Sequence, residues 1–147
     1  MAEPRDWALT SFHFTVEWGG TEISAQEVTG LSLSTEFIEY RAGNDPTFVK
    51  QKVPGLKSFE NITIKKGMFR GDVDFYTWYQ DVQSNPERRE DIVINLLDEE
   101  HNPVMSWTIV NAYPIKISGP DLNGENNAIA VETLELAHEG ITLESVG

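Results

Sequence analysis

Apolar and polar residues alternate near the start of the chain, a pattern typical of a strand with one buried face. The apolar positions of this strand are Phe12, Phe14, Val16 and Trp18. Gly19-Gly20 follows at once, and this dipeptide tolerates the positive φ angles of a tight hairpin turn. The pattern then predicts a long second strand over 22–40, with a bulge or a bend near Gly30.

One segment, residues 72–84, has the periodicity of a helix. Its apolar residues recur at i, i+3, i+4 and i+7, which are Phe75, Trp78, Tyr79 and Val82. Asp72 or Asp74 is suited to cap the first turn. Asn85-Pro86 ends the helix, because proline pushes the residue before it out of the helical region.

The remaining apolar segments predict further strands over 58–66, 91–97 and 128–139. Residues 91–97 are apolar on both faces, which indicates a buried central strand. Residues 104–117 are either a strand pair or one long strand that bends near Pro114. The total is six to eight strands and one helix, without an internal repeat. This predicts a mainly β chain that forms a single domain over 1–147. We expect the domain to be a β-barrel or sandwich with the helix packed on it.

Residues 41–56 show no sustained period and contain Asn44-Asp45-Pro46 and Pro54-Gly55, so we expect a long ordered loop there. Loops of this length in compact domains are usually functional or make contacts. This loop also lies in the most basic part of the chain, because residues 41–70 hold seven of the 11 basic side chains and two acids. The basic segment is either a solvated loop or a surface that docks on the acidic part of the next copy.

The composition narrows the possible chemistry. The 147 residues carry 24 acids against 11 bases, a net charge of −13, which argues against nucleic acid as the ligand of the free chain. The absence of cysteine excludes disulfides, cysteine–zinc sites and thiol nucleophiles. We find no apolar run of membrane-spanning length and no signal peptide, so we expect a chain that folds in the cytoplasm and does not insert into membranes.

No catalytic, cofactor or metal motif stands out, so we expect no enzymatic activity and no cofactor. His13, His101 and His138 are isolated in the sequence, without the spacing that places two metal ligands on one helix face. A calcium loop is nearly matched by Asp121, Asn123, Glu125 and Glu132. The glycine that such a loop needs at its sixth position is Asn126, and a turn rich in Asx residues fits better.

Several phrases in order resemble the tail-tube proteins of contractile phages and of phage-derived contractile injection systems. They cover residues 12–140 and include EVTGL at 27–31, EYRAG at 39–43, KVPG at 52–55, FENITIKKG at 59–67, INLLD at 94–98, PV at 103–104, PIK at 114–116 and VETLELAHEG at 131–140, together with Trp78 and Trp107. Each phrase is weak alone, and together they are specific. The short chain resembles the tube of extracellular injection particles at least as closely as that of a phage.

This resemblance implies a flattened β-barrel with a flanking helix, whose subunits close into a hexameric ring. Rings would stack into a hollow tube inside a contractile sheath and carry protein effectors or DNA without binding them tightly. The implied partners are further copies, the sheath, the baseplate and spike hub, and the tail terminator, in a particle assembled in the bacterial cytoplasm and later released. The implied inter-subunit contacts lie in the 41–56 loop, at Arg41, Asn44, Asp45, Phe48, Lys50, Lys52 and Pro54.

An alternative function is a monomeric β-barrel that binds a small ligand in its mouth. It requires an apolar interior pocket, which the tube function does not.

Overall fold

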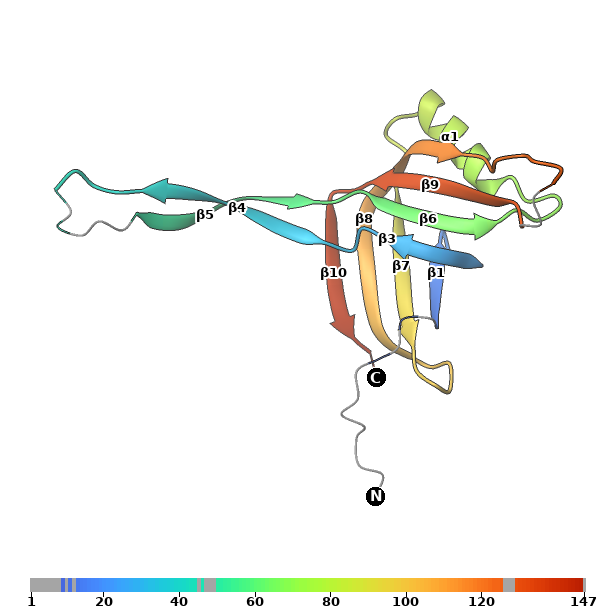
Figure 1. Cartoon of the computed structure of the whole chain (residues 1–147), viewed down its shortest axis with the longest axis horizontal. Coiled ribbons are helices and arrows are strands. Elements are labelled where there is room, and N and C mark those ends of the chain that lie inside the picture. The colour runs from blue at the N-terminus through green and yellow to red at the C-terminus, as the bar shows by residue number, and fades with distance from the viewer. Residues whose placement is uncertain are drawn as a thin grey trace, which may run out of the picture.

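The computed structural model describes residues 9, 11, 13–44, 46, 50–125 and 129–146. Most of these residues lie in strands, and one helix packs on them (Figure 1). The elements are β1 (Phe14–Trp18), β2 (Thr21–Ile23), β3 (Ala25–Thr29), β4 (Leu33–Tyr40), β5 (Gln51–Phe59), β6 (Ile62–Gly67), α1 (Asp74–Ser84), β7 (Glu90–Leu97), β8 (Pro103–Ser118), β9 (Val131–Ala137) and β10 (Gly140–Ser145).

The strands form one large antiparallel sheet and one separate hairpin. The large sheet has the order β2-β1-β7-β8-β9-β6-β3, and β10 pairs with β8. The long strand β8 joins its two parts, because its first half pairs with β7 and β10 and its second half pairs with β9. Asn111, at φ 53°, lies where β8 changes partners. The hairpin consists of β4 and β5.

The prediction of a closed barrel was wrong. Within the described residues the path of paired strands ends at β2 and at β3, and these two strands do not pair with each other. The described chain also has ten strands rather than six to eight. An open sheet with free edges therefore replaces the closed barrel, and within the described residues β2, β3 and β10 each keep one unpaired side.

Alternating residues of the sheet and one stripe of the helix form the core. Strands β1, β6, β7, β8 and β9 turn apolar side chains toward α1, which buries Phe75, Trp78 and Val82. The rings of Trp18 and Trp78 stack with their centroids 4.7 Å apart. The buried residues of the sheet are Val16, Ile62, Ile64, Ile92, Ile94, Ile109, Ala112, Leu134 and Leu136. The helix thus covers one face of the sheet with the periodicity that the sequence predicts.

Several predicted boundaries need correction. The second strand is divided into β2, β3 and β4, with breaks at Ser24 and around Gly30. Residues 51–56 of the expected 41–56 loop belong to β5, whereas its described residues 41–44, 46 and 50 lie outside strands. The strand predicted over 128–139 is β9, which covers Val131–Ala137, and Ala128 lies outside the described residues. The last strand, β10, was not predicted. Residues 104–117 form one long bent strand, the second of the two alternatives.

Helix α1 begins at Asp74, two residues later than predicted, with Val73 in the capping position. The carboxylate of Asp72 accepts a hydrogen bond from the backbone N–H of Asp74 at 3.2 Å. Asp72 therefore satisfies a free N–H at the start of the helix from just outside it. No helix in the described part of the chain is long and apolar enough to cross a membrane.

Candidate assembly interface

The hairpin of β4 and β5, here called the arm (residues 33–59), projects from one end of the body (Figure 1). Its two strands pair antiparallel from Leu33↔Phe59 at the base to Tyr40↔Gln51 near the tip. Neither strand pairs with any other described strand. An isolated two-stranded hairpin is only marginally stable in water, so an arm of this length needs a surface that covers it.

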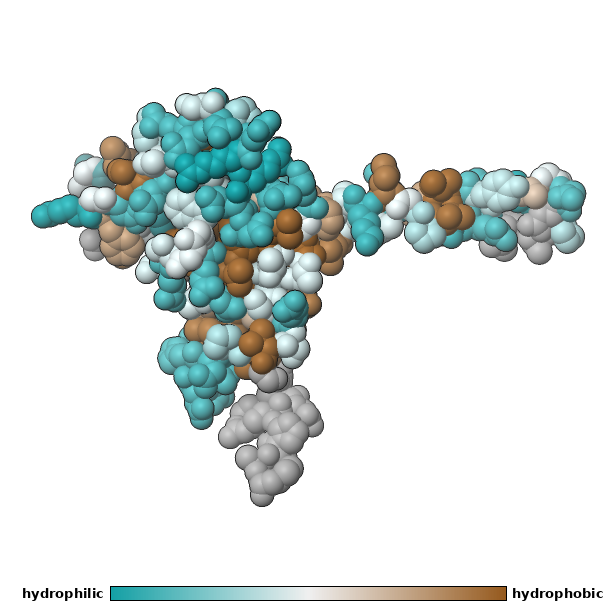
Figure 2. Space-filling view, turned by 180° about the vertical axis from the view of Figure 1, so that it is seen from behind, coloured by the Kyte–Doolittle hydropathy of each residue, from teal (hydrophilic) through white to brown (hydrophobic). Residues whose placement is uncertain are grey.

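The arm exposes large apolar side chains along its length. Phe37, Ile38 and Tyr40 are 56%, 59% and 58% exposed, and Leu56 is 81% exposed. Apolar surface is visible along the arm in the space-filling view (Figure 2). Burying a side chain of this size is worth about 1.5–3 kcal/mol. The arm therefore carries a considerable amount of association energy that the single chain does not use.

Each face of the arm has its own chemistry, because neighbouring residues of a strand point to opposite faces. On one face Phe37 lies opposite Pro54, and Lys52 places its ammonium 4.9 Å from the centroid of the Phe37 ring. On the other face Ile38 lies opposite Val53. Tyr40, opposite Gln51, lies on this same face as Ile38. Glu39 lies on the face of Phe37 and forms an ion pair with Lys50 at 3.4 Å. One face thus presents an aromatic ring with a cation above it and an acid beside it, and the other presents aliphatic side chains and a tyrosine.

Two glycines allow close backbone approaches that shape the arm. Gly30, at φ 95° just before the arm, lies so near the turn between β5 and β6 that a Cβ would be 2.1 Å from the carbonyl oxygen of Asn61. A Cβ on Gly55 would lie 2.9 Å from the carbonyl oxygen of Glu36 on the opposite strand. Any side chain at these positions would push the two passing segments apart.

The structure places the described members of the predicted contact set on this arm. Arg41 and Asn44 follow β4 near the tip, Lys50 directly precedes β5, and Lys52 and Pro54 lie within β5. Asp45 and Phe48 lie outside the described residues. The exposed apolar residues of the arm were not among the predicted contacts. The sequence did contain a signal for these exposed residues, because the adjacent pair Phe37-Ile38 puts an apolar side chain on each face of one strand.

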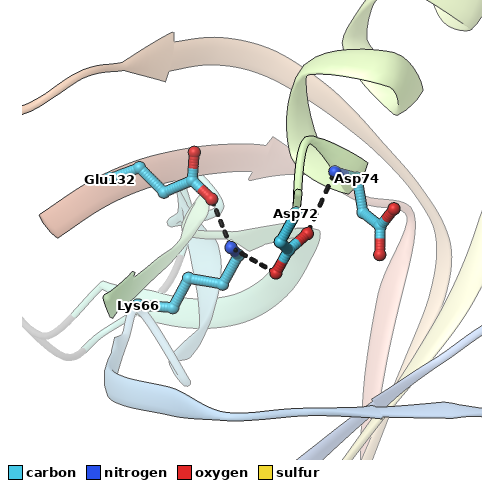
Figure 3. A network of polar contacts seen from close by, with 4 residues as sticks. All are labelled: Lys66, Asp72, Asp74 and Glu132. Carbon is cyan, nitrogen blue, oxygen red and sulfur yellow. Dashed lines mark hydrogen bonds and ion pairs between the residues drawn. The ribbon is translucent and has the colours of Figure 1, made fainter. Parts of the chain in front are cut away.

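At the opposite side of the body, a buried lysine ties two strands to the start of the helix (Figure 3). Lys66 on β6 is 2% exposed, and its ammonium lies 3.0 Å from Asp72 and pairs with Glu132 on β9. The ammonium also lies 4.9 Å from the centroid of the Phe75 ring. Buried charges of this kind are tolerated when each one has a partner, as here.

The charges of this network shift each other's titration. Burial opposes the charged form of Lys66, but hydrogen bonds and attraction from Glu132 and Asp72 outweigh it and raise the pKa of Lys66 above 10.5. The hydrogen bond from Lys66 lowers the pKa of Asp72 below 3.8; partial burial opposes this shift, and the N–H of Asp74 reinforces it. Lys66 and Asp72 are therefore both charged at neutral pH.

A pocket of about 390 Å³ opens beside this network, between the β1–β2 turn, the loop before α1 and residues 88–90. Its aromatic walls are Trp18, Phe69 and Phe75, and its carboxylates are Glu22, Asp72, Asp74 and Glu90. The two cations of its lining, Lys66 and Arg88, are each held by two acids. Within the described residues, Glu22 and Asp74 have no ion pair.

The histidines divide into a pair and a single residue. The rings of His13 and His101 stack with centroids 4.7 Å apart, and His138 is hydrogen-bonded through Nε2 to the carbonyl oxygen of Glu60 at 2.9 Å. No group of three or more His, Asp or Glu residues in the described ranges is arranged to hold a metal ion.

The calcium-like segment has a different structure from a calcium site. Glu132, its twelfth residue, is buried against Lys66 and is not available as a calcium ligand. Asn123 accepts the backbone N–H of Glu125 at 2.9 Å, which is an Asx turn. Asn126 lies outside the described residues. The turn interpretation is therefore the one that the described residues support.

The protein family follows from comparison with known proteins. The family model of the T4-like virus tail tube protein gp19 matches residues 10–142. The chain belongs to this tail tube family. The match spans the arm, the helix and all of the sheet except the end of β10. A search of curated protein sequences gave no match.

Several solved structures are similar to this tail tube protein. A chain from the sheath–tube complex of the PVC extracellular contractile injection system, in the extended state, is 30% identical, with 96% of this chain and 94% of that chain covered and a TM-score of 0.88. A chain from the tube-terminating cap of the anti-feeding prophage is 28% identical, with 99% and 97% covered and a TM-score of 0.88. Hcp1 from Flavobacterium johnsoniae shares the fold at 16% identity, with 90% and 94% covered and a TM-score of 0.62.

The tail tube protein is a structural component of a phage-like particle, as the family and these neighbours indicate. The tube function that the sequence resemblance implied is confirmed.

Proposed function

We propose that this tail tube protein forms the inner tube of an extracellular contractile injection system, in which six subunits close into a ring and rings stack inside a contractile sheath. The single observation that carries this proposal is the arm, a hairpin whose large apolar side chains are exposed in the single chain. The similarity to a chain of the PVC sheath–tube complex supports the choice of an extracellular particle over a phage virion.

The free sheet edges support assembly through strand pairing. In the described chain β2 and β3 each have one unpaired side, and such edges are usually covered in stable proteins. Neighbouring subunits in a ring would pair these edges and would complete the barrel that the single chain leaves open. The predicted contacts Arg41, Asn44, Asp45, Phe48, Lys50, Lys52 and Pro54 would then lie between subunits or between rings.

The role proposed for the tube is mechanical and needs no catalytic site or cofactor. Contraction of the sheath would supply the work, and the tube would provide stiffness and a passage for protein effectors or DNA. The chain has a net charge of −13, so a lumen wall that shares this charge would repel acidic cargo and let it slide. The proposed partners are further copies, the sheath, the baseplate and spike hub, and the terminator, with assembly in the bacterial cytoplasm before release.

Negative-stain microscopy of the purified protein tests the proposal, together with a variant of the arm. We expect hollow rings or tubes from the wild type, and their loss when Ile38→Ser and Tyr40→Ser remove two exposed apolar side chains. The control is Leu122→Ser, which removes an 88% exposed apolar side chain from a loop of the body. A wild-type protein that forms neither rings nor tubes, alone or with its baseplate, would contradict the proposal.

A further inference from the structure

The arm and the acidic pocket lie at opposite ends of the molecule. The arm projects from one end of the body, and the loops that follow β6 and precede β9 lie at the other end (Figure 1). The pocket is beside the first of these loops, which contributes Phe69 and Asp72 to its lining. Two different surfaces at opposite ends of one chain can repeat head to tail, so that each copy contacts the next.

The chemistry of the two surfaces matches. One face of the arm presents Phe37, with Lys52 above its ring, and Pro54 opposite it in the hairpin. Lys52 has no ion pair within the described part of the chain. The pocket offers groups that can bind a cation and an aromatic ring. Its wall contains aromatic side chains and two carboxylates, Glu22 and Asp74, that form no ion pair with any described cation.

We infer that the Phe37–Lys52–Pro54 face of the arm docks on a second copy at the pocket between Glu22 and Asp74, with the Lys52 ammonium between these two carboxylates. Aromatic rings and carboxylates together bind an ammonium group well, through cation–π attraction and charge-assisted hydrogen bonds. Phe37 would pack against Phe69, which is 58% exposed in the single chain. The inference rests on the proposed tube function and names the surface that receives the arm.

The net charges of the two surfaces are opposite in sign. The arm, residues 33–59, carries four basic side chains and three acids, a net charge of +1. The pocket lining has four acids and two bases, and both of these bases are already paired with acids. Complementary potentials of this kind select the partner surface and speed association.

Disulfide trapping tests the contact directly, because the chain contains no cysteine of its own. Pro54→Cys on the arm and Thr21→Cys at the pocket are prepared in separate proteins, which are mixed and oxidised during assembly. We expect a cross-linked dimer from this mixture and none when Thr21→Cys is replaced by Glu100→Cys, in the exposed turn between β7 and β8. The inference would be overturned by an equal yield of dimer with Glu100→Cys. It would also be overturned if Pro54→Cys and Thr21→Cys assemble into normal tubes together but give no cross-linked dimer.

Charge reversal provides a second readout that does not depend on cysteine geometry. Lys52→Glu and Glu22→Lys should each lower the yield of tubes at least several-fold, and the double variant should restore most of it. The control for Lys52→Glu is Lys116→Glu, which makes the same change in net charge at an exposed position of β8. If tubes form normally in both single variants, the inference fails while the proposed function stands. If the wild type itself never assembles, both fail.

Discussion

Lys66 on β6 holds the carboxylate of Asp72, in the segment that leads into α1, at a distance of 3.0 Å. Lys66 also pairs with Glu132 on β9, so one buried ammonium joins two strands of the sheet to the start of the helix (Figure 3). The pocket that we assign to the arm of a second copy shares Lys66 and Asp72 with this network. The network therefore positions a surface of the molecule as well as its core.

Removing the buried ammonium should be costly. Lys66→Met leaves Glu132 buried without a partner, and breaking a buried pair in this way costs about 3–5 kcal/mol. Urea denaturation of the monomer should show this loss in the free energy of unfolding. Lys65→Met is the matched control, because its ion pair with Glu27 is exposed, and exposed pairs contribute about 0–1 kcal/mol. Equal losses in the two variants would show that burial of Lys66 contributes nothing.

A double substitution separates the charge from the packing. Lys66→Met combined with Glu132→Leu removes both buried charges, and we expect it to recover most of the stability that Lys66→Met alone loses. A double variant as unstable as the single one would mean that the ion pair itself, not the unpaired carboxylate, is what the fold requires. The measurement is again the free energy of unfolding in urea.

The network predicts how stability changes with pH. The pKa of Asp72 is lowered in the folded state, so its stabilisation is present above 3.8, its ordinary pKa, and is lost as the pH falls through the lowered value. The pKa of Lys66 is raised, so its contribution is present below 10.5 and is lost as the pH rises through the raised value. Unfolding free energies between pH 2 and 5 should therefore fall less steeply in Asp72→Asn than in the wild type. Parallel curves would rule out this role of Asp72.

Gly30 should be intolerant of any side chain. Its φ is 95°, and a Cβ would lie 2.1 Å from the carbonyl oxygen of Asn61, so Gly30→Ala must displace backbone at the base of the arm. Gly20→Ala is the control, because Gly20 has a φ of 81° but nothing within 4 Å of a Cβ. We expect Gly20→Ala to cost about 1–2 kcal/mol from strain and Gly30→Ala to cost clearly more. Thermal unfolding of the two monomers measures the difference, and equal melting temperatures would contradict the clash.

Reversing two charges of the arm should weaken assembly without unfolding the body. Lys50→Glu together with Lys52→Glu replaces the ion pair with Glu39 by a repulsion and removes the cation above Phe37. Light scattering should show fewer and smaller assemblies, while the circular dichroism spectrum of the monomer stays unchanged. Wild-type assembly should also weaken as the salt concentration rises, because salt screens exposed charges. Unchanged tubes from the double variant would remove the charge argument.

The local patterns of the sequence predicted the elements whose cause is local. Phe75, Trp78 and Val82 recur with the period of a helix, and all three are buried in α1. Val16 lies on the buried face of the strand whose alternation predicted it. The break near Gly30 was predicted as well. Its cause is seen only in the three-dimensional structure, because the residue that approaches Gly30 is Asn61, which is distant in the sequence.

Features that depend on distant partners were not predictable in the same way. The pairing of β4 with β5 makes an arm from residues that resemble a strand followed by a loop. Glu132 resembled a calcium ligand, yet it is paired with Lys66, a residue far away in the sequence. A signal for this pair existed, because Lys66 follows Ile62 and Ile64 on the buried face of β6, where an unpaired charge would be costly.

Hydrogen exchange of the arm, measured by mass spectrometry on the monomer and on assembled particles, tests the central claim most directly. The backbone amides of β4 and β5 that face outward from the hairpin have no partner strand in the described chain. We expect these residues to exchange rapidly in the monomer and to become strongly protected in the assembly, while the core around Trp78 exchanges slowly in both. Equal exchange of the arm in the two states would show that no neighbouring subunit covers it, and would contradict the account.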